Sequence, residues 1–152
     1  MPTWIDEKLA IAPMPSEDQI PELAKTFKAV VILVEDQELD YDIHQWGKFG
    51  VKVKHMPIPD FGTPGLNDLH EVIEWINREI EDGKVLVHCL GGIGRSGMVA
   101  TAYLISKGFS VNEAIKHVRA RVPGAIETRE QEELLRRFAR KFNINGNILI
   151  TT

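Results

Sequence analysis

Residues 88–97 read His-Cys-Leu-Gly-Gly-Ile-Gly-Arg-Ser-Gly and directly follow the apolar run 85–87. Cys89 is the only cysteine among the 152 residues, so the chain can form neither an internal disulfide nor a metal site with four cysteine ligands. A single cysteine is either an inert buried thiol or a reactive thiolate. The glycines and the arginine beside Cys89 favour the thiolate, because such a loop can surround an anion.

This loop joins a predicted buried strand to a predicted helix, which is where ligands bind in open α/β sheets. The N–H groups at the start of a helix are unpaired and carry positive partial charge. Glycines let successive N–H groups turn toward an anion, and Arg95 can add a bidentate guanidinium. The predicted phosphate-binding residues are Leu90, Gly91, Gly92, Ile93, Gly94 and Arg95. The positive charge of these N–H groups and of Arg95 also favours the thiolate form of Cys89.

Three other interpretations of this loop are weaker. The stretch 92–97 matches a Gly-x-Gly-x-x-Gly dinucleotide loop, but it occurs late in the chain and no acidic strand end follows about 20 residues on. A nucleoside-triphosphate loop requires Gly-Lys-Ser/Thr, whereas this loop has Gly-Arg-Ser. A structural turn around a buried cysteine leaves the arginine and the glycine cluster without a role.

The pattern His88-Cys89-x5-Arg95-Ser96 resembles the signature of cysteine-based protein tyrosine and dual-specificity phosphatases. Asp60 lies on an Ile-Pro-Asp loop 29 residues before Cys89, where these phosphatases carry their general-acid aspartate. The segment 121–126, followed by Gln131, resembles the compact dual-specificity enzymes. The likeness covers about residues 28–140, and the short chain favours the compact type, including small archaeal relatives.

The resemblance implies a role for each matching residue. Cys89 would attack phosphorus and form a phosphocysteine intermediate, while Arg95 would bind the phosphoryl oxygens and stabilise their charge. Asp60 would protonate the leaving oxygen and later deprotonate the attacking water. Ser96 would stabilise the departing thiolate. Gln131 would orient the hydrolytic water.

Some of these residues have an alternative structural explanation. Asp60 stands in Pro-Asp-Phe-Gly, which is favourable turn sequence. Ser96 also suits the first turn of a helix. Gln131 stands three residues after Thr128, where a capping box places Glu or Gln, and we slightly favour this cap.

Two neighbours of the predicted catalytic residues have supporting roles, and three carboxylates compete with Asp60. His88 either positions the loop through a hydrogen bond or is a satisfied buried histidine. Phe61 either lines the substrate pocket or anchors its loop in the core. The other candidates for the general acid are Asp36, Glu127 and Glu130.

The order of the predicted elements indicates one α/β domain over residues 1–152. Strands are predicted at 9–12, 29–34, 51–56 and 85–88, with helices from 16 to 27, 40 to 47, 66 to 83, 95 to 107, 110 onward and 128 to 142. Strands that alternate with helices favour a mostly parallel central sheet of about four to five strands flanked by helices. Residues 143–152 contain β-like residues of uncertain order.

Composition narrows the function further. The net charge of −4 argues against nucleic-acid binding, and no apolar stretch reaches membrane-spanning length. The first residues do not resemble a signal peptide, so a cytoplasmic monomer is expected. Residues 107–141 are rich in lysine and arginine and 35–42 are acidic; we interpret both as solvated helix surfaces in preference to a positive face near an anionic site. The resemblance implies neither a metal nor a cofactor.

The expected function is hydrolysis of phosphotyrosine, and of phosphoserine or phosphothreonine, on proteins or peptides. Lysines would suit inositol phosphates, but the chain has the apolar Leu90 and Ile93 inside the loop. One alternative is a catalytically silent module that binds phosphoproteins. Another is a sulfur-transfer or arsenate-reducing enzyme; arsenate reduction usually requires further cysteines, which this chain does not have.

Overall fold

The computed structural model describes residues 2–142, and a five-stranded sheet forms its centre. The strands are β1 (Thr3–Trp4), β2 (Leu9–Ala12), β3 (Phe27–Ile32), β4 (Lys52–His55) and β5 (Lys84–His88). Their order is β1-β2-β5-β3-β4; β2, β5, β3 and β4 are parallel, and only β1 is antiparallel to its neighbour. The predicted α/β class and the mostly parallel sheet are therefore confirmed.

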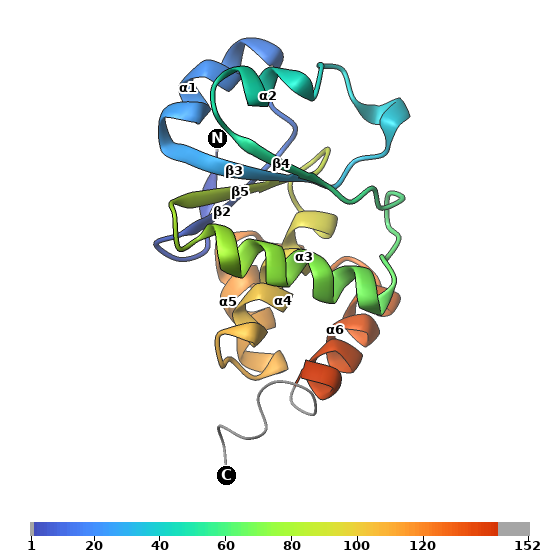
Figure 1. The fold of residues 1–152 in the computed structure, drawn as a ribbon. Helices are drawn as coiled ribbons and strands as arrows, with labels where there is room; N and C mark the ends of the chain where they lie inside the picture. The colour runs from blue at the N-terminus through green and yellow to red at the C-terminus, as the bar shows by residue number, and fades with distance from the viewer. Residues whose placement is uncertain (1, 143–152) are drawn as a thin grey trace.

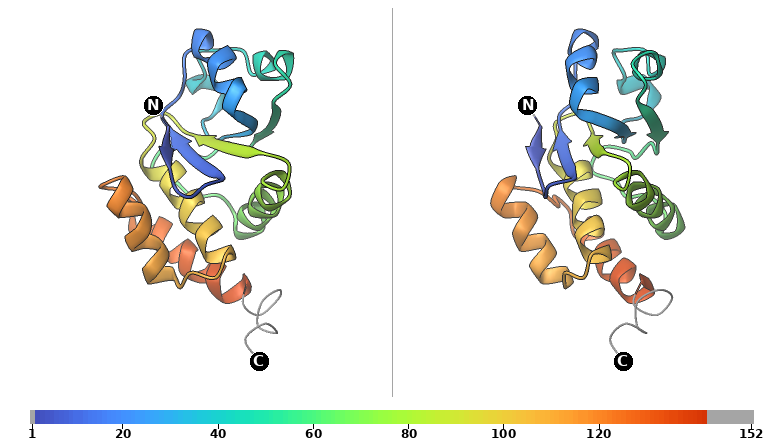
Figure 2. Two further views of the ribbon diagram at one scale, coloured as in Figure 1. Left: turned by 90° about the vertical axis from the view of Figure 1, so that its left-hand side faces the viewer. Right: turned by 60° about the vertical axis from the view of Figure 1, so that its left-hand side comes forward.

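Six α-helices cover the two faces of this sheet. They are α1 (Ile20–Thr26), α2 (His44–Lys48), α3 (Leu66–Glu79), α4 (Gly94–Ser106), α5 (Val111–Arg121) and α6 (Arg129–Phe142). Helices α1 and α2 lie on one face, and α3 to α6 lie on the other (Figures 1 and 2). Helix α4 is buried from Gly94 to Ile105, because the other three helices of its layer surround it. Within residues 2–142, no helix is long and apolar enough to cross a membrane.

The structure differs from the sequence prediction mainly in its short elements. Strand β1 was not predicted, and its Trp4 stacks on Phe27 with ring centroids 5.3 Å apart. The helix predicted from residue 16 is divided into a 3-10 turn, Glu17–Gln19, and α1, which ends where Phe27 becomes extended. The helix predicted at 40–47 is α2, and a second 3-10 turn, Asp36–Glu38, precedes it. The β-like stretch noted at 143–152 lies outside the described residues.

The parallel strands bring four loops to one edge of the sheet. Residues 13–19, 33–43, 56–65 and 89–93 follow the carboxyl ends of β2, β3, β4 and β5, respectively. Backbone hydrogen bonds connect these loops, since Met14 N–H donates to Leu90 O at 3.0 Å and Ile58 N–H donates to Leu33 O at 2.9 Å. We call this set the carboxyl-edge loops. They bring the predicted catalytic residues of distant segments together.

Candidate active site

The segment 89–93 forms a tight loop between β5 and α4. Gly92 has a φ of +78°, and a Cβ built on it would lie 2.7 Å from Pro13 N and 2.9 Å from Ala12 C. Only glycine can hold this conformation at such a close backbone approach. The loop therefore turns sharply against the end of β2 and returns to the first residue of α4.

Cys89 stands at the start of this loop and is 2% exposed. Its Sγ accepts a hydrogen bond from Gly92 N–H at 3.2 Å. The sulfur therefore faces into the turn of the loop, where backbone N–H groups and the start of α4 provide positive partial charge. This is the environment in which a thiolate is stabilised.

Arg95 lies on the first turn of α4, and its side chain is 2% exposed. Its Nη1 donates to Glu38 Oε1 at 2.8 Å and to Ile58 O at 2.8 Å, and its Nη2 donates to Glu38 Oε2 at 3.0 Å. Nη2 also lies 3.7 Å from Asp60 Oδ1. The guanidinium is thus held by two of the carboxyl-edge loops and lies beside a second carboxylate.

Electrostatics keep this pair charged. Burial opposes the charge of Arg95, but the hydrogen bonds and charge of Glu38 outweigh it and raise the pKa of Arg95. The bond from Arg95 in turn holds the pKa of the Glu38 carboxyl below its usual value. Sequence reasoning missed Glu38. The available signal was its place in the acidic stretch that follows β3, the strand next to β5.

Asp60 lies on a turn in the loop after β4, and its side chain is 53% exposed. Gly62 N–H donates to Pro59 O at 2.7 Å and Phe61 has a φ of +62°, which together define a turn of type II geometry. A left-handed conformation is unfavourable for a bulky residue. The turn leaves Phe61 60% exposed instead of anchoring it in the core.

His88 is fully buried beneath the loop and joins a chain of hydrogen bonds. Trp46 Nε1–H donates to Tyr41 Oη at 2.9 Å, and Tyr41 Oη lies 2.7 Å from His88 Nε2. Burial raises the pKa of Tyr41 to about 12, so its hydroxyl remains protonated. It therefore donates a hydrogen bond to His88 Nε2. Nδ1–H is then left to donate to Cys89 O at 3.1 Å. The predicted hydrogen bond from His88 to the loop is present in this network.

The same histidine is neutral over the physiological pH range. Burial lowers the pKa of His88 to about 4, against a partial opposing effect of the bond to Cys89 O. A neutral imidazole with one donor and one acceptor fits the hydrogen bonds on its two nitrogens. His88 therefore orients the Cys89 peptide group without adding a charge beneath the site.

Ser96 follows Arg95 and is fully buried. Its Oγ has no hydrogen-bond partner among the described residues. A buried hydroxyl without a partner is costly, and such groups in native structures occur at functional sites. Ser96 is therefore available to donate a hydrogen bond to a group that forms during a reaction.

Gln131 uses both ends of its amide in structural hydrogen bonds. Its Oε1 accepts from Glu127 N–H at 2.8 Å and Thr128 N–H at 3.3 Å, and its own N–H donates to Thr128 Oγ1 at 3.1 Å. This is the capping box that begins α6. Nε2–H donates to Gly62 O at 3.2 Å, so the same side chain also attaches the loop of Asp60 to α6.

The three competing carboxylates lie in different places. Asp36 is highly exposed, and its Oδ1 lies 4.0 Å from His55 Nδ1 instead of on Arg95. Glu130 lines a groove between α6 and Thr63 of the loop after β4, together with Arg137 and Arg140. Glu127 packs against the first residue of α4, where a Cβ on Gly94 would collide with its carboxylate oxygen.

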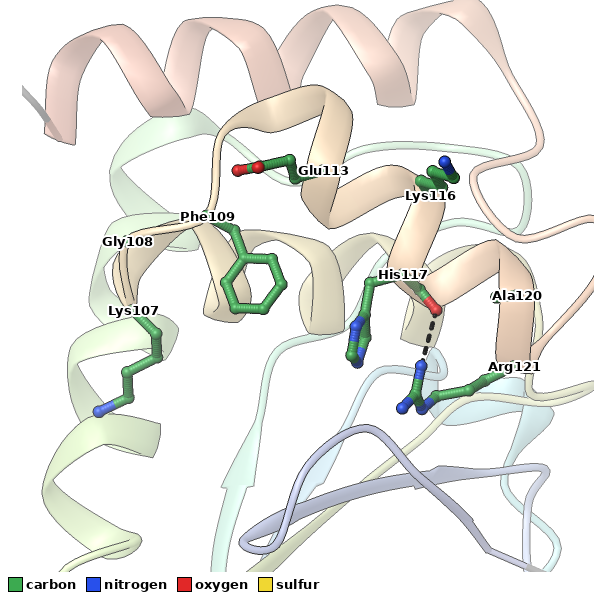
Figure 3. A pocket seen from close by; sticks show the side chains of 8 residues that line it. All are labelled: Lys107, Gly108, Phe109, Glu113, Lys116, His117, Ala120 and Arg121. Atoms are coloured by element: carbon green, nitrogen blue, oxygen red, sulfur yellow. Dashed lines mark hydrogen bonds between the residues drawn. The ribbon is translucent and has the colours of Figure 1, made fainter.

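A separate groove on α5 contains none of these residues. Lys107, Gly108, Phe109, Glu113, Lys116, His117, Ala120 and Arg121 line it (Figure 3). Phe109 and His117 meet edge to face there, and Arg121 Nη1 donates to His117 O at 3.3 Å. Because no residue of the loop 89–93 or of the Asp60 turn lines this groove, it is not part of the candidate active site.

Comparison with known proteins identifies the class of this site. A family model described as "Polymorphic toxin system, DSP-PTPase phosphatase" matches residues 8–109. The match spans the strands β2 to β5, the Asp60 turn and the loop with Cys89 and Arg95. The chain belongs to this DSP-PTPase phosphatase family, as its resemblance to dual-specificity phosphatases predicts.

Individual relatives agree with this assignment. Cyclin-dependent kinase inhibitor 3 of Rattus norvegicus is 38% identical over 104 residues, which are 66% of this chain and 48% of that protein. The tyrosine-protein phosphatase CDC14 homolog of Schizosaccharomyces pombe is 36% identical over 95 residues, 62% of this chain and 18% of the other. The chain thus spans about half the length of the first relative and less of the second.

Among solved structures, Tk-PTP in its active form matches with a TM-score of 0.89 and 46% identity, covering 92% of this chain and 97% of the other. PTPMT1 matches with a TM-score of 0.86 over 96% of this chain and 98% of the other, at 22% identity, and supports the fold alone. These matches extend over most of the α/β fold described above.

Proposed function

We propose that this chain hydrolyses phosphate monoesters on protein side chains through a phosphocysteine intermediate. The observation that carries the proposal is the joint placement of Cys89 and Arg95. One short loop holds the thiol in a turn of backbone N–H groups and brings the guanidinium beside Asp60, at 3.7 Å. Membership of the DSP-PTPase phosphatase family supports the proposal.

In the first step, the Cys89 thiolate attacks phosphorus and the bond from phosphorus to the substrate oxygen breaks. Asp60, in its protonated form, gives its proton to that leaving oxygen. Arg95 and the N–H groups of the loop bind the non-bridging oxygens as charge develops on them. The Glu38 carboxylate and Ile58 O fix the guanidinium for this task, since Nη1 donates to both acceptors.

In the second step, water attacks phosphorus of the phosphocysteine and the bond from phosphorus to sulfur breaks. The Asp60 carboxylate takes the proton of that water, and inorganic phosphate leaves. Sulfur departs as a thiolate, and we assign to the Ser96 hydroxyl, which has no partner among the described residues, the hydrogen bond that stabilises it. We assign Gln131 to positioning the Asp60 loop, because its amide is bound to Gly62 O and to the cap of α6.

Hydrolysis of p-nitrophenyl phosphate in EDTA tests this function. We expect turnover that resists EDTA, vanishes in Cys89→Ser and leaves a phosphate on sulfur that rapid acid quench can trap. Loss of activity on addition of EDTA would contradict the mechanism. Tight binding of phosphate analogues without any turnover would instead support the catalytically silent binding module.

A further inference from the structure

The carboxyl-edge loops carry a one-sided charge around the phosphate-binding loop. Residues 13–19, 33–43, 56–65 and 89–93 contain two, five, one and no Asp or Glu residues, respectively, and none of them contains a Lys or Arg. The acidic residues are Glu17, Asp18, Glu35, Asp36, Glu38, Asp40, Asp42 and Asp60. A site for an anionic group is therefore bordered by negative charge along the carboxyl-edge loops.

Arg95 does not compensate for this negative charge. Its guanidinium reaches the site from α4, but both Glu38 oxygens already bind it and Asp60 lies 3.7 Å from Nη2. Backbone N–H groups can still bind one phosphoryl group at short range. A second phosphate or a row of carboxylates that extends toward the loops 13–19 and 33–43 would meet their acidic residues.

The side of the site formed by the segment 122–128 and the start of α6 has a mixed charge. The segment from 122 to 128 contributes Glu127, whose carboxylate packs against Gly94, and Arg129 is the exposed first residue of α6. Lys116 and Arg121 of α5 line the groove of Figure 3, whereas Arg119 of the same helix donates to Ala125 O at 2.8 Å and to Ile126 O at 2.9 Å. This side therefore carries charges of both signs, whereas the carboxyl-edge loops carry eight carboxylates and no Lys or Arg.

These loops also expose large apolar side chains beside Cys89 and Asp60. Phe61 is 60%, Leu90 44% and Ile93 37% exposed, and they are three of the five large exposed hydrophobic residues within 2–142. Phe61 follows Asp60 directly, while Leu90 and Ile93 belong to the loop between Cys89 and Arg95. Exposed apolar side chains that are continuous with a reactive site commonly contact a bound partner.

We propose that the substrate is a singly phosphorylated protein segment in which basic and apolar residues flank the phosphorylated one. This inference rests on the proposed phosphatase function and names its substrate class. Lysine or arginine residues of the segment pair with the carboxyl-edge loops, and apolar residues beside the phosphate pack on Phe61, Leu90 and Ile93. Acidic phosphopeptides and inositol polyphosphates are poor substrates, because their additional charges meet the same carboxylates.

Three phosphotyrosine peptides of equal length test this proposal, with basic, neutral or acidic residues on both sides of a leucine-phosphotyrosine-leucine centre. Each pair of opposite charges about 10 Å apart in water changes binding about two-fold. With several such pairs, kcat/KM for the basic peptide should exceed that for the acidic one by at least about ten-fold at low salt. The difference should shrink in about 0.5 M salt, where screening shortens the range of the charges.

A charge-reversal variant tests whether the carboxyl-edge loops cause the preference for the basic peptide. Glu17→Lys combined with Asp40→Lys changes two exposed residues on two of these loops, and neither contacts Arg95 or Cys89 in the structure. Glu81→Lys combined with Asp82→Lys is the matched control, with the same change in charge before β5, at the opposite edge of the sheet. The first pair should lower the basic-to-acidic ratio of kcat/KM several-fold, and the second should leave it unchanged.

The results separate this inference from the proposed function. Failure to hydrolyse p-nitrophenyl phosphate would overturn the function itself. If that compound is hydrolysed but the acidic peptide or inositol hexakisphosphate is preferred, the substrate class is wrong and the function stands. Equal kcat/KM for all three peptides at low salt, or equal effects of the two charge-reversal pairs, would overturn the inference as well.

Discussion

The guanidinium of Arg95 is bound by both carboxylate oxygens of Glu38, at 2.8 and 3.0 Å, across 57 positions of sequence. This pairing fixes the side chain that must bind phosphate, because Arg95 is buried and its rotamers are restricted by two parallel hydrogen bonds. It also neutralises much of the arginine charge before a substrate arrives. Glu38 therefore orients the Arg95 guanidinium but also reduces the positive charge that is available to bind phosphate.

Replacement of Glu38 by glutamine should reduce catalysis through orientation. The amide of the variant can accept only one of the two hydrogen bonds, and Arg95 is left as a buried charge with an incomplete partner. We expect kcat/KM for p-nitrophenyl phosphate to fall at least about ten-fold and the free energy of unfolding to fall by about 2 kcal/mol. Denaturant titration and steady-state kinetics measure both, and unchanged kcat/KM would mean that Glu38 does not orient Arg95 during turnover.

Substrates with different leaving groups distinguish Asp60 from the other candidate carboxylates. Asp60→Asn removes the proton donor, so kcat should fall about 10²-fold or more with phenyl phosphate, whose leaving group requires protonation. The loss should be smaller with p-nitrophenyl phosphate, whose leaving group is more stable as an anion. Asp36→Asn is the control, since Asp36 faces His55, and it should leave both rates unchanged. Equal losses in both variants would contradict the assignment of Asp60.

Much of this architecture could be predicted because it depends on local pattern. The continuous apolar runs before residues 34 and 88 predict buried parallel strands, and the glycine-rich stretch after Cys89 predicts a turn at a strand end. Parallel strands bring their carboxyl ends to one edge, and the resemblance to phosphatases, not this order, distinguishes Asp60 from the other carboxylates at that edge. These features require no knowledge of side-chain geometry.

The contacts between distant side chains could not be predicted in this way. Glu38 is one of several acidic residues after β3, and no periodicity distinguishes the one that reaches Arg95. The bond from Gln131 to Gly62 O depends on how α6 packs, although the capping box at its start was visible from Thr128. Strand β1 is two residues long and gives no pattern to detect.

Gln131 should act on stability and loop position, not on the water of the second step. Gln131→Ala removes the capping box and the bond to Gly62 O, so the free energy of unfolding should fall by about 1–2 kcal/mol. Gln131→Glu keeps an acceptor for the cap and should lose less stability. If Gln131 oriented water instead, phosphocysteine would accumulate in Gln131→Ala. Rapid quench with a ³²P-labelled substrate measures that accumulation, and we expect none above wild type.

Acid should destabilise the fold through His88. Burial lowers the pKa of His88 to about 4, whereas the pKa of a histidine in the unfolded chain is about 6.5. Between these values the unfolded state binds more protons, so stability is complete above about pH 6.5 and decreases as pH falls toward 4. Protonation of His88 should therefore lower the free energy of unfolding by about 3 kcal/mol in total.

Denaturant titrations from pH 8 to pH 4 measure this dependence, with His88→Asn as the comparison. The variant has no titrating imidazole and should be less stable at pH 8 but show a shallower decrease toward pH 4. His44→Asn is the matched control, because His44 is exposed and pairs with Asp42 on the surface. Parallel curves for wild type and His88→Asn would show that His88 does not carry the acid sensitivity.

Alanine should be harmful at only one of the two adjacent glycines of the phosphate-binding loop. A methyl group on Gly92 is strained at a φ of +78° and collides with the backbone at Ala12 and Pro13, whereas one on Gly91 meets nothing within 4 Å. Gly92→Ala should therefore displace the loop and lower both vanadate affinity and kcat/KM at least about ten-fold, since about 1–2 kcal/mol of backbone strain adds to the collision. Gly91→Ala should stay within about two-fold of wild type, since its methyl group has open space. Inhibition by vanadate and p-nitrophenyl phosphate kinetics measure both variants. Similar losses in the two would contradict the loop geometry on which the phosphate site depends.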